Sequence, residues 1–172
     1  MHQSAIIRLL VLAGAGLLAF AAMHDIGFRT VPNRVSLGIL ICGLALRLLT
    51  GDVFYGLLCG AIMFSFTYGF WRLGWMGGAD VKLLTASAVF VPPLMVPTLV
   101  IGTSLAGGVL ALIYVIGSSL VPRRPAVAYH GRPHGLMRRA MRCELRRLRR
   151  RGPLPYAAAI ATGGWLAIAA SS

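Results

Sequence analysis

Acidic side chains are rare in this chain, so their positions are the first place to look for chemistry. The 172 residues include only four carboxylates against seventeen basic side chains, which gives a formal net charge of +13. Asp80 follows Gly77 and Gly78 in the stretch WMGGADVKLL, and it precedes Lys82 by two positions. Asp25 lies at the end of the first apolar block. Two carboxyl groups at short range share a proton and can activate a water molecule, because both cannot ionise cheaply.

Each of these residues also has a purely structural interpretation. A carboxylate at a helix start, as expected for Asp80, caps free N–H groups and is stabilised by the helix dipole. Asp25 is expected at the carboxyl end of a helix, where the dipole disfavours an anion unless Arg29, one turn later, pairs with it. Lys82 either holds a local anion or extends toward the lipid headgroups. These alternatives remain open from the residues alone.

The remaining polar residues give weaker indications of chemistry. Asp52 follows Gly51 in a short turn, and Glu144 is spaced to pair with Arg147 about one helical turn further on. The four histidines show no metal-ligand spacing, and the three cysteines form no C-x-x-C pair. We therefore expect neither a disulfide framework nor a metal site.

The composition indicates a membrane protein. Apolar residues make up 58% of the chain, and the mean hydropathy is +0.78. Long apolar blocks of about 20 residues are typical of membrane-spanning helices. We predict an all-α polytopic bundle of about six transmembrane helices, formed by residues 1–172 as one integral-membrane domain. The predicted spans are 5–23, 35–49, 53–70, 81–101, 102–120 and 155–170.

Prolines interrupt the fourth of these spans. They allow an alternative in which 81–91 is a short helix that turns back at Pro92-Pro93. The following helix would then begin near 94–98 and run to about residue 120.

Loop charges orient the chain, because positively charged loops stay in the cytoplasm. With the amino terminus outside, fifteen of the seventeen basic residues fall on the inner side, eleven of them arginines within 121–154. The first block has the apolar core of a signal peptide, but Arg29 and Arg34 follow it closely, which favours a retained span. We expect Asp25 and Asp80 at the cytoplasmic rim of the plasma membrane.

The basic loop within 121–154 contains the arginine stretch 138–151. Apolar residues recur in this region at helical spacing, as expected for an amphipathic helix on an anionic lipid surface. No aromatic interleaving or nucleic-acid-binding fold accompanies the arginines, so we expect no nucleic acid partner.

Two motifs together resemble a known family. DIGFRTVPN (25–33) and MGGADVKLL (76–84) look like the paired aspartate motifs of type IV prepilin peptidases, which are membrane aspartyl proteases of the G-x-G-D class. LPYAAAIATGG (154–164) is similar to the last span of that family. The resemblance implies that Asp25 and Asp80 are the catalytic pair. The residues that it implies as motif support are Arg29, Pro32, Asn33, Gly77, Gly78 and Lys82.

The resemblance carries departures and expectations of its own. Ala79 replaces the second glycine of G-x-G-D, and Ala157 stands where glycine is commoner after Pro-Tyr. The chain looks like the short, peptidase-only type of tight-adherence or Flp pili, without a C-x-x-C domain, so methyltransferase activity is not expected. The implied substrates are prepilins or pseudopilins with a short basic leader, and no metal or organic cofactor is implied.

Two other functions remain open. A non-enzymatic scaffold or transporter subunit would use the acids as helix caps, but a transporter would place ionisable groups nearer the bilayer midplane. A related intramembrane aspartyl protease with another substrate is the nearer alternative.

Overall fold

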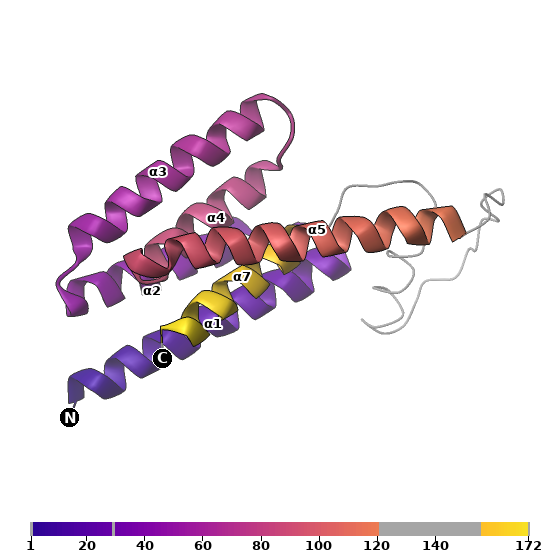
Figure 1. The fold of residues 1–172 in the computed structure, drawn as a ribbon. Helices are drawn as coiled ribbons and strands as arrows, with labels where there is room; N and C mark the ends of the chain where they lie inside the picture. The colour runs from indigo at the N-terminus through magenta and orange to yellow at the C-terminus, as the bar shows by residue number, and fades with distance from the viewer. Residues whose placement is uncertain (1, 29, 121–155, 172) are drawn as a thin grey trace.

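The computed structural model describes residues 2–28, 30–120 and 156–171, with side chains for 3–28, 30–116 and 156–171. All regular structure in these residues is helical, which confirms the all-α fold (Figure 1). The helices are α1 (His2–Phe28), α2 (Asn33–Thr50), α3 (Val53–Arg72), α4 (Gly78–Phe90), a 3-10 turn η1 (Pro93–Met95), α5 (Val96–Leu120) and α7 (Tyr156–Ala170).

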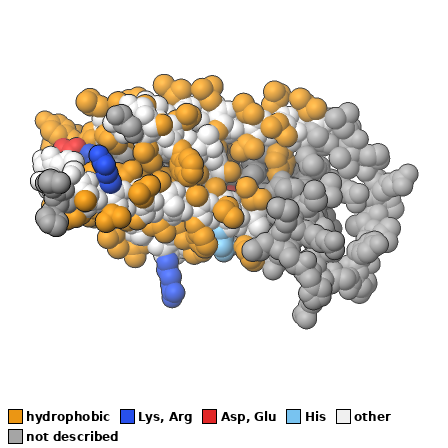
Figure 2. Space-filling model, turned by 90° about the horizontal axis from the view of Figure 1, so that it is seen from below, with side chains coloured by type: hydrophobic (Ala, Val, Ile, Leu, Met, Phe, Trp, Pro, Cys, Tyr) orange, Lys and Arg blue, Asp and Glu red, His pale blue; other side chains and the backbone are white. Residues whose placement is uncertain are grey.

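Four of these helices are long and apolar enough to cross a membrane, namely α1, α2, α3 and the segment Pro93–Ile116 that contains most of α5. The helices α4 and α7 are shorter, at 13 and 15 residues. Many large apolar side chains point outward, including Leu12 and Phe54 at 68% and 72% exposure. In the described part of Figure 2, hydrophobic side chains cover much of the visible face and charged side chains are few. Such a surface is suited to lipid and not to water.

The predicted spans 81–101 and 102–120 are wrong as written, because the chain breaks at Pro92-Pro93 and not at residue 101. The short helix α4 ends at Phe90, and α5 then runs without interruption from Val96 to Leu120. Proline lacks an N–H and restricts the residue before it, so Val91 and Pro92 are extended. The alternative with a short helix that turns back is the one observed.

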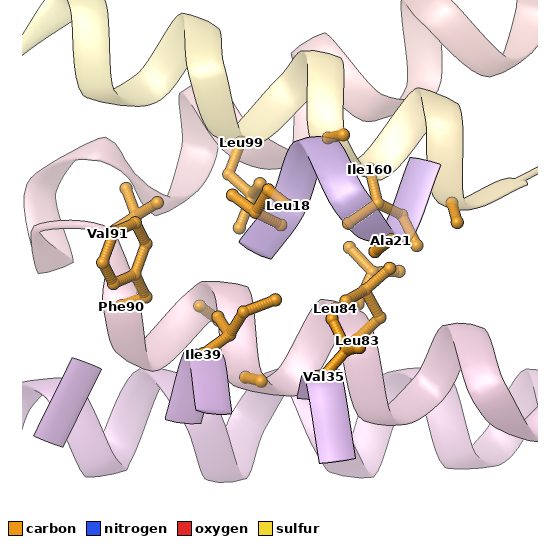
Figure 3. Packing of buried hydrophobic residues seen from close by; sticks show 14 of the residues in the cluster. Leu18, Ala21, Val35, Ile39, Leu83, Leu84, Phe90, Val91, Leu99 and Ile160 are labelled. Atoms are coloured by element: carbon orange, nitrogen blue, oxygen red, sulfur yellow. The ribbon is translucent and has the colours of Figure 1, made fainter. Parts of the chain in front are cut away.

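The helix α4 runs antiparallel to α3 and parallel to α2, because their starts meet at Asn33 and Lys82 and their ends at Arg47 and Phe90. The helix α4 packs on both α2 and α3, while α7 packs on α1 and α5. Side chains from α1, α2, α3, α4, α5 and α7 meet in a common core, part of which is shown in Figure 3. The fully buried members of this core that Figure 3 labels include Leu18, Ala21, Ile39, Leu83, Leu99 and Ile160. Packing in this core holds α4 and α7 in the bundle, although both helices are shorter than the roughly 20 residues of a typical membrane span.

Two glycines let helix backbones approach closely. A Cβ on Gly43 of α2 would lie 2.8 Å from the backbone of Phe90 in α4. A Cβ on Gly163 of α7 would lie 2.6 Å from the carbonyl oxygen of Leu99 in α5. Small residues at such contacts are a common means of packing helices in lipid, where hydrophobicity alone does not hold helices together.

One end of the bundle is held by a buried arginine. Arg47 is only 4% exposed, and its Nη1 donates to Asp52 Oδ2 at 2.6 Å. Its Nη2 donates to the carbonyl oxygen of Phe90 at 3.4 Å, and Gly56 leaves room for its aliphatic stem. Arg47 therefore ties together the end of α2, the start of α3 and the end of α4. Asp52 is not only a turn residue but the partner of this arginine.

Candidate functional site

Asp25 lies in the last turn of α1 and is half-buried. The backbone N–H of Ala157 donates to its Oδ2 at 3.4 Å. Ala157 is the second residue of α7, where N–H groups have no partner within the helix and the dipole favours an anion. The start of α7 therefore offsets the unfavourable dipole of α1 at Asp25. Sequence reasoning missed this contact, although the Pro-Tyr start of the last span marks the helix end that provides it.

Asp80 lies in the first turn of α4 and is also half-buried. A backbone hydrogen bond from Gly77, the residue that precedes the helix, reaches its carboxylate, as in one half of a capping box. A Cβ on Gly77 would lie only 3.0 Å from Asp80 Oδ2. Gly77 has an ordinary extended backbone with φ −72°, so glycine is needed here for space and not for conformation. Asp80 therefore accepts a hydrogen bond at the start of α4, as its structural interpretation predicts.

The two carboxylates are electrostatically coupled. Asp80 lies outside the four helices that are long enough to span a membrane. Burial raises the pKa of Asp80, the negative charge of Asp25 raises it further, and the hydrogen bond from Gly77 lowers it. The net result is a pKa of about 6 instead of 3.8. The structure thus brings together two acids that lie 55 positions apart in the sequence.

Polar contacts join the segments around the two acids. Lys82 Nζ, one turn from the start of α4, donates to Asn33 Oδ1 at 3.2 Å. Asn33 is the first residue of α2, and Pro32 precedes it in extended conformation. Lys82 and Asn33 are both exposed, so the ammonium group of Lys82 is hydrogen-bonded to a neutral amide at the protein surface. Arg29, the other motif residue expected here, lies outside the described residues.

The glycine pair before Asp80 is exposed. A Cβ on Gly78 would lie 3.4 Å from the indole nitrogen of Trp71, which is an ordinary contact, so Gly78 is less constrained than Gly77. Ala79, in place of the second motif glycine, packs against the hydrophobic core. The open backbone at positions 77 and 78 leaves space beside Asp80 for an extended peptide to approach.

His24 has a role that sequence reasoning missed. Its Nδ1 is hydrogen-bonded to the carbonyl oxygen of Thr30, and its ring lies 5.7 Å from Phe20 and 4.7 Å from Phe28 between centroids. It thus connects the last turns of α1 to the segment that leads into α2. Within the described parts of the chain, no three His, Cys, Asp or Glu residues come together as a metal site would require.

The expectations for the basic loop concern residues that the structure does not describe. The loop 121–154, its arginine stretch 138–151 and the pair Glu144–Arg147 lie outside the described residues.

The fold and the coupled carboxylates define a multi-pass helical membrane protein with two acids at one end of the bundle. The profile of the type IV leader peptidase family matches residues 12–112, more than half of the chain and including both Asp25 and Asp80. The chain belongs to the type IV leader peptidase family, and the protein is accordingly a membrane protease. Searches against curated proteins and against solved structures found no significant match.

Proposed function

We propose that this protein is an aspartic-type endopeptidase that removes the short basic leader of type IV prepilins or pseudopilins. The observation that carries the proposal is the electrostatic coupling of Asp25 and Asp80, because a peptidase of this kind needs one carboxylate and one carboxylic acid side by side. Membership of the leader peptidase family supports the substrate class.

The proposed reaction uses the two carboxyl groups in turn. The ionised member of the pair takes a proton from a water molecule, whose oxygen attacks the carbonyl carbon of the scissile peptide bond. The protonated member gives its proton to the carbonyl oxygen as the tetrahedral intermediate forms. Collapse of the intermediate breaks the C–N bond, and the carboxyl that accepted the proton from water delivers it to the departing amine. The other carboxylate takes a proton from a hydroxyl of the intermediate as the C=O bond re-forms, which restores the starting state of the pair. Because the pair titrates jointly, the roles belong to the pair and not to either residue.

The same proposal includes an orientation in the plasma membrane. Arg34, Arg72 and Lys82 lie at helix ends around the candidate site, whereas Arg8 and Arg47 lie toward the opposite ends of their helices. The segment that joins α5 to α7 adds eleven arginines. By the positive-inside rule, this distribution supports an amino terminus outside and a candidate site at the cytoplasmic face. A leader that stays in the cytoplasm would then reach the two acids without crossing the bilayer.

The proposal is tested by co-expression with a candidate prepilin, with leader removal followed as a gel shift. Asp25→Asn and Asp80→Asn should each abolish processing while the variant still inserts into the membrane. Asp52→Asn is the matched control, because it makes the same change at the other end of the bundle, and it should still process the prepilin in proportion to the inserted protein. Normal processing by either of the first two variants would refute the mechanism.

A further inference from the structure

An open apolar groove of about 590 Å³ lies between α1 and α7. Figure 1 shows α7 lying along α1, and the two helices pack together in antiparallel directions. The groove is lined mainly by alanines from both helices, with larger side chains at its edges. The lining residues that matter for its shape are Ala19, Ala22, Met23, Ala158, Thr162 and Trp165.

One end of the groove lies near the candidate active site. On α1 its lining includes Met23 and Ala22, which lie two and three residues before Asp25. On α7 its lining starts at Ala158, which follows the residue whose N–H donates to Asp25. One end of the groove therefore lies within one helical turn of the first candidate carboxylate.

From this end the groove runs along the bundle toward the opposite side of the membrane. Its lining on α7 extends from Ala158 to Ala169, which corresponds to about 16 Å at the rise of an α-helix. This distance is about half the hydrocarbon thickness of a bilayer. The groove is thus directed away from Asp25 and into the apolar layer, parallel to the helices that form it.

The walls of the groove suit a helix better than a single flexible chain. Alanine side chains on the floor let a third helix backbone come close, as small residues do at helix contacts in membranes. Met23 and Trp165 form the edges and are 73% and 52% exposed. The indole N–H of Trp165 donates to the carbonyl oxygen of Ala15 at 3.3 Å, so this edge is held in place by α1.

We propose that the groove between α1 and α7 docks the apolar helix of the substrate. The inference rests on the proposed function, in which the scissile bond joins a leader at the membrane rim to a hydrophobic helix. A helix seated in the groove places its rim end beside Asp25 and leaves the leader outside the bilayer. Binding of the helix then provides affinity and fixes the depth of the bond to be cleaved, without contact between the groove and the leader.

The first test fills the groove. Ala19 lines it, whereas Ala13 is an exposed alanine on the same helix outside it. Ala19→Leu should raise the KM for a full-length prepilin about tenfold with little change in kcat, as expected for the loss of a helix–helix contact in a membrane. Ala13→Leu should behave as the wild type. Equal KM values for the two variants would overturn the inference.

The second test does not depend on how well a filled groove folds. A photo-crosslinking amino acid is placed at Thr162, which is exposed within the groove, or at Ser104, which is exposed on α5. In membranes that contain prepilin, position 162 should give an adduct with the helix of the prepilin and position 104 should not. Adducts at position 162 with lipid alone, or with this chain alone, would overturn the inference.

These outcomes separate the inference from the proposed function. If the wild type leaves the prepilin intact, both fail. If it cleaves the prepilin but position 162 forms no adduct with the substrate, only the docking groove is refuted.

Discussion

Replacement of Asp80 by asparagine should make the folded protein more stable at neutral pH while it abolishes cleavage. The folded protein holds a proton on Asp80 more tightly than the unfolded chain does, because the pKa rises from 3.8 to about 6. The stability that this proton contributes is fully present below about pH 4 and is lost as the pH rises through 6. Above pH 6 the wild type therefore carries a destabilising charge that the asparagine variant lacks.

The magnitude follows from the same values. A rise from 3.8 to about 6 corresponds to about 3 kcal/mol of differential stabilisation. Asp80 is only half-buried, so solvent screening reduces this free energy, and we expect about 1–2 kcal/mol. For a chain of this size that is an increase in Tm of about 2–8 °C.

The assay is thermal unfolding of the purified protein in detergent at several pH values. The difference in Tm between Asp80→Asn and the wild type should be largest at pH 7–8 and disappear near pH 4. An asparagine variant that melts at or below the wild-type temperature at pH 8 would refute the reasoning.

Asp52→Asn is a control in which the stability should change in the opposite direction. Burial acts to raise the pKa of Asp52, but hydrogen bonds from Thr50 and Arg47 and the charge of Arg47 outweigh it, and the pKa is lowered below 3.8. Stability from the ionised Asp52 is present at neutral pH and is lost as the pH falls below about 4. Asp52→Asn should therefore lower the Tm at pH 7, and this loss should fade in acid.

Three further changes test other parts of the structure. Gly77→Ala should slow leader cleavage about tenfold or more, because its Cβ would lie 3.0 Å from the carboxylate of Asp80. The control Gly69→Ala, whose Cβ would have nothing within 4 Å, should cleave normally. Equal cleavage rates for the two variants would contradict this. Arg47→Met should destabilise the protein by about 2–4 kcal/mol in detergent unfolding, since it leaves the partly buried carboxylate of Asp52 without its cationic partner. An unchanged Tm would count against this. A double-mutant cycle between Lys82 and Asn33 should give a coupling below about 1 kcal/mol, because both are exposed; a much larger value would mean that the contact is shielded from water.

The helices themselves were readily predicted from the sequence. Hydrophobic blocks mark α1, α2 and α3 to within a few residues, because a chain in lipid must satisfy its backbone hydrogen bonds within each helix. The proline pair after Val91 marks the break between α4 and α5, since proline cannot continue a helix. The paired motifs around Asp25 and Asp80 identified the candidate site.

The sequence did not predict which helices pack together. Lipid is as apolar as the side chains that face the core, so hydropathy does not distinguish the two faces of a helix. The contact between Asp25 and the start of α7 therefore required the structure. The same holds for Arg47, whose charge predicts an exposed position, whereas its ion pair with Asp52 and the carbonyl oxygen of Phe90 allow it to be buried.

The central claim is that the two carboxyl groups act as one charge-coupled pair, and infrared titration of isotope-labelled aspartate carboxyls tests it most directly. The wild type should show a carboxyl that loses its proton near pH 6, and this signal should be absent from Asp80→Asn. In Asp25→Asn the same signal should move to lower pH, because the neighbouring negative charge is gone. If the midpoint in Asp25→Asn stays where it is in the wild type, the two acids are not coupled and the account is contradicted.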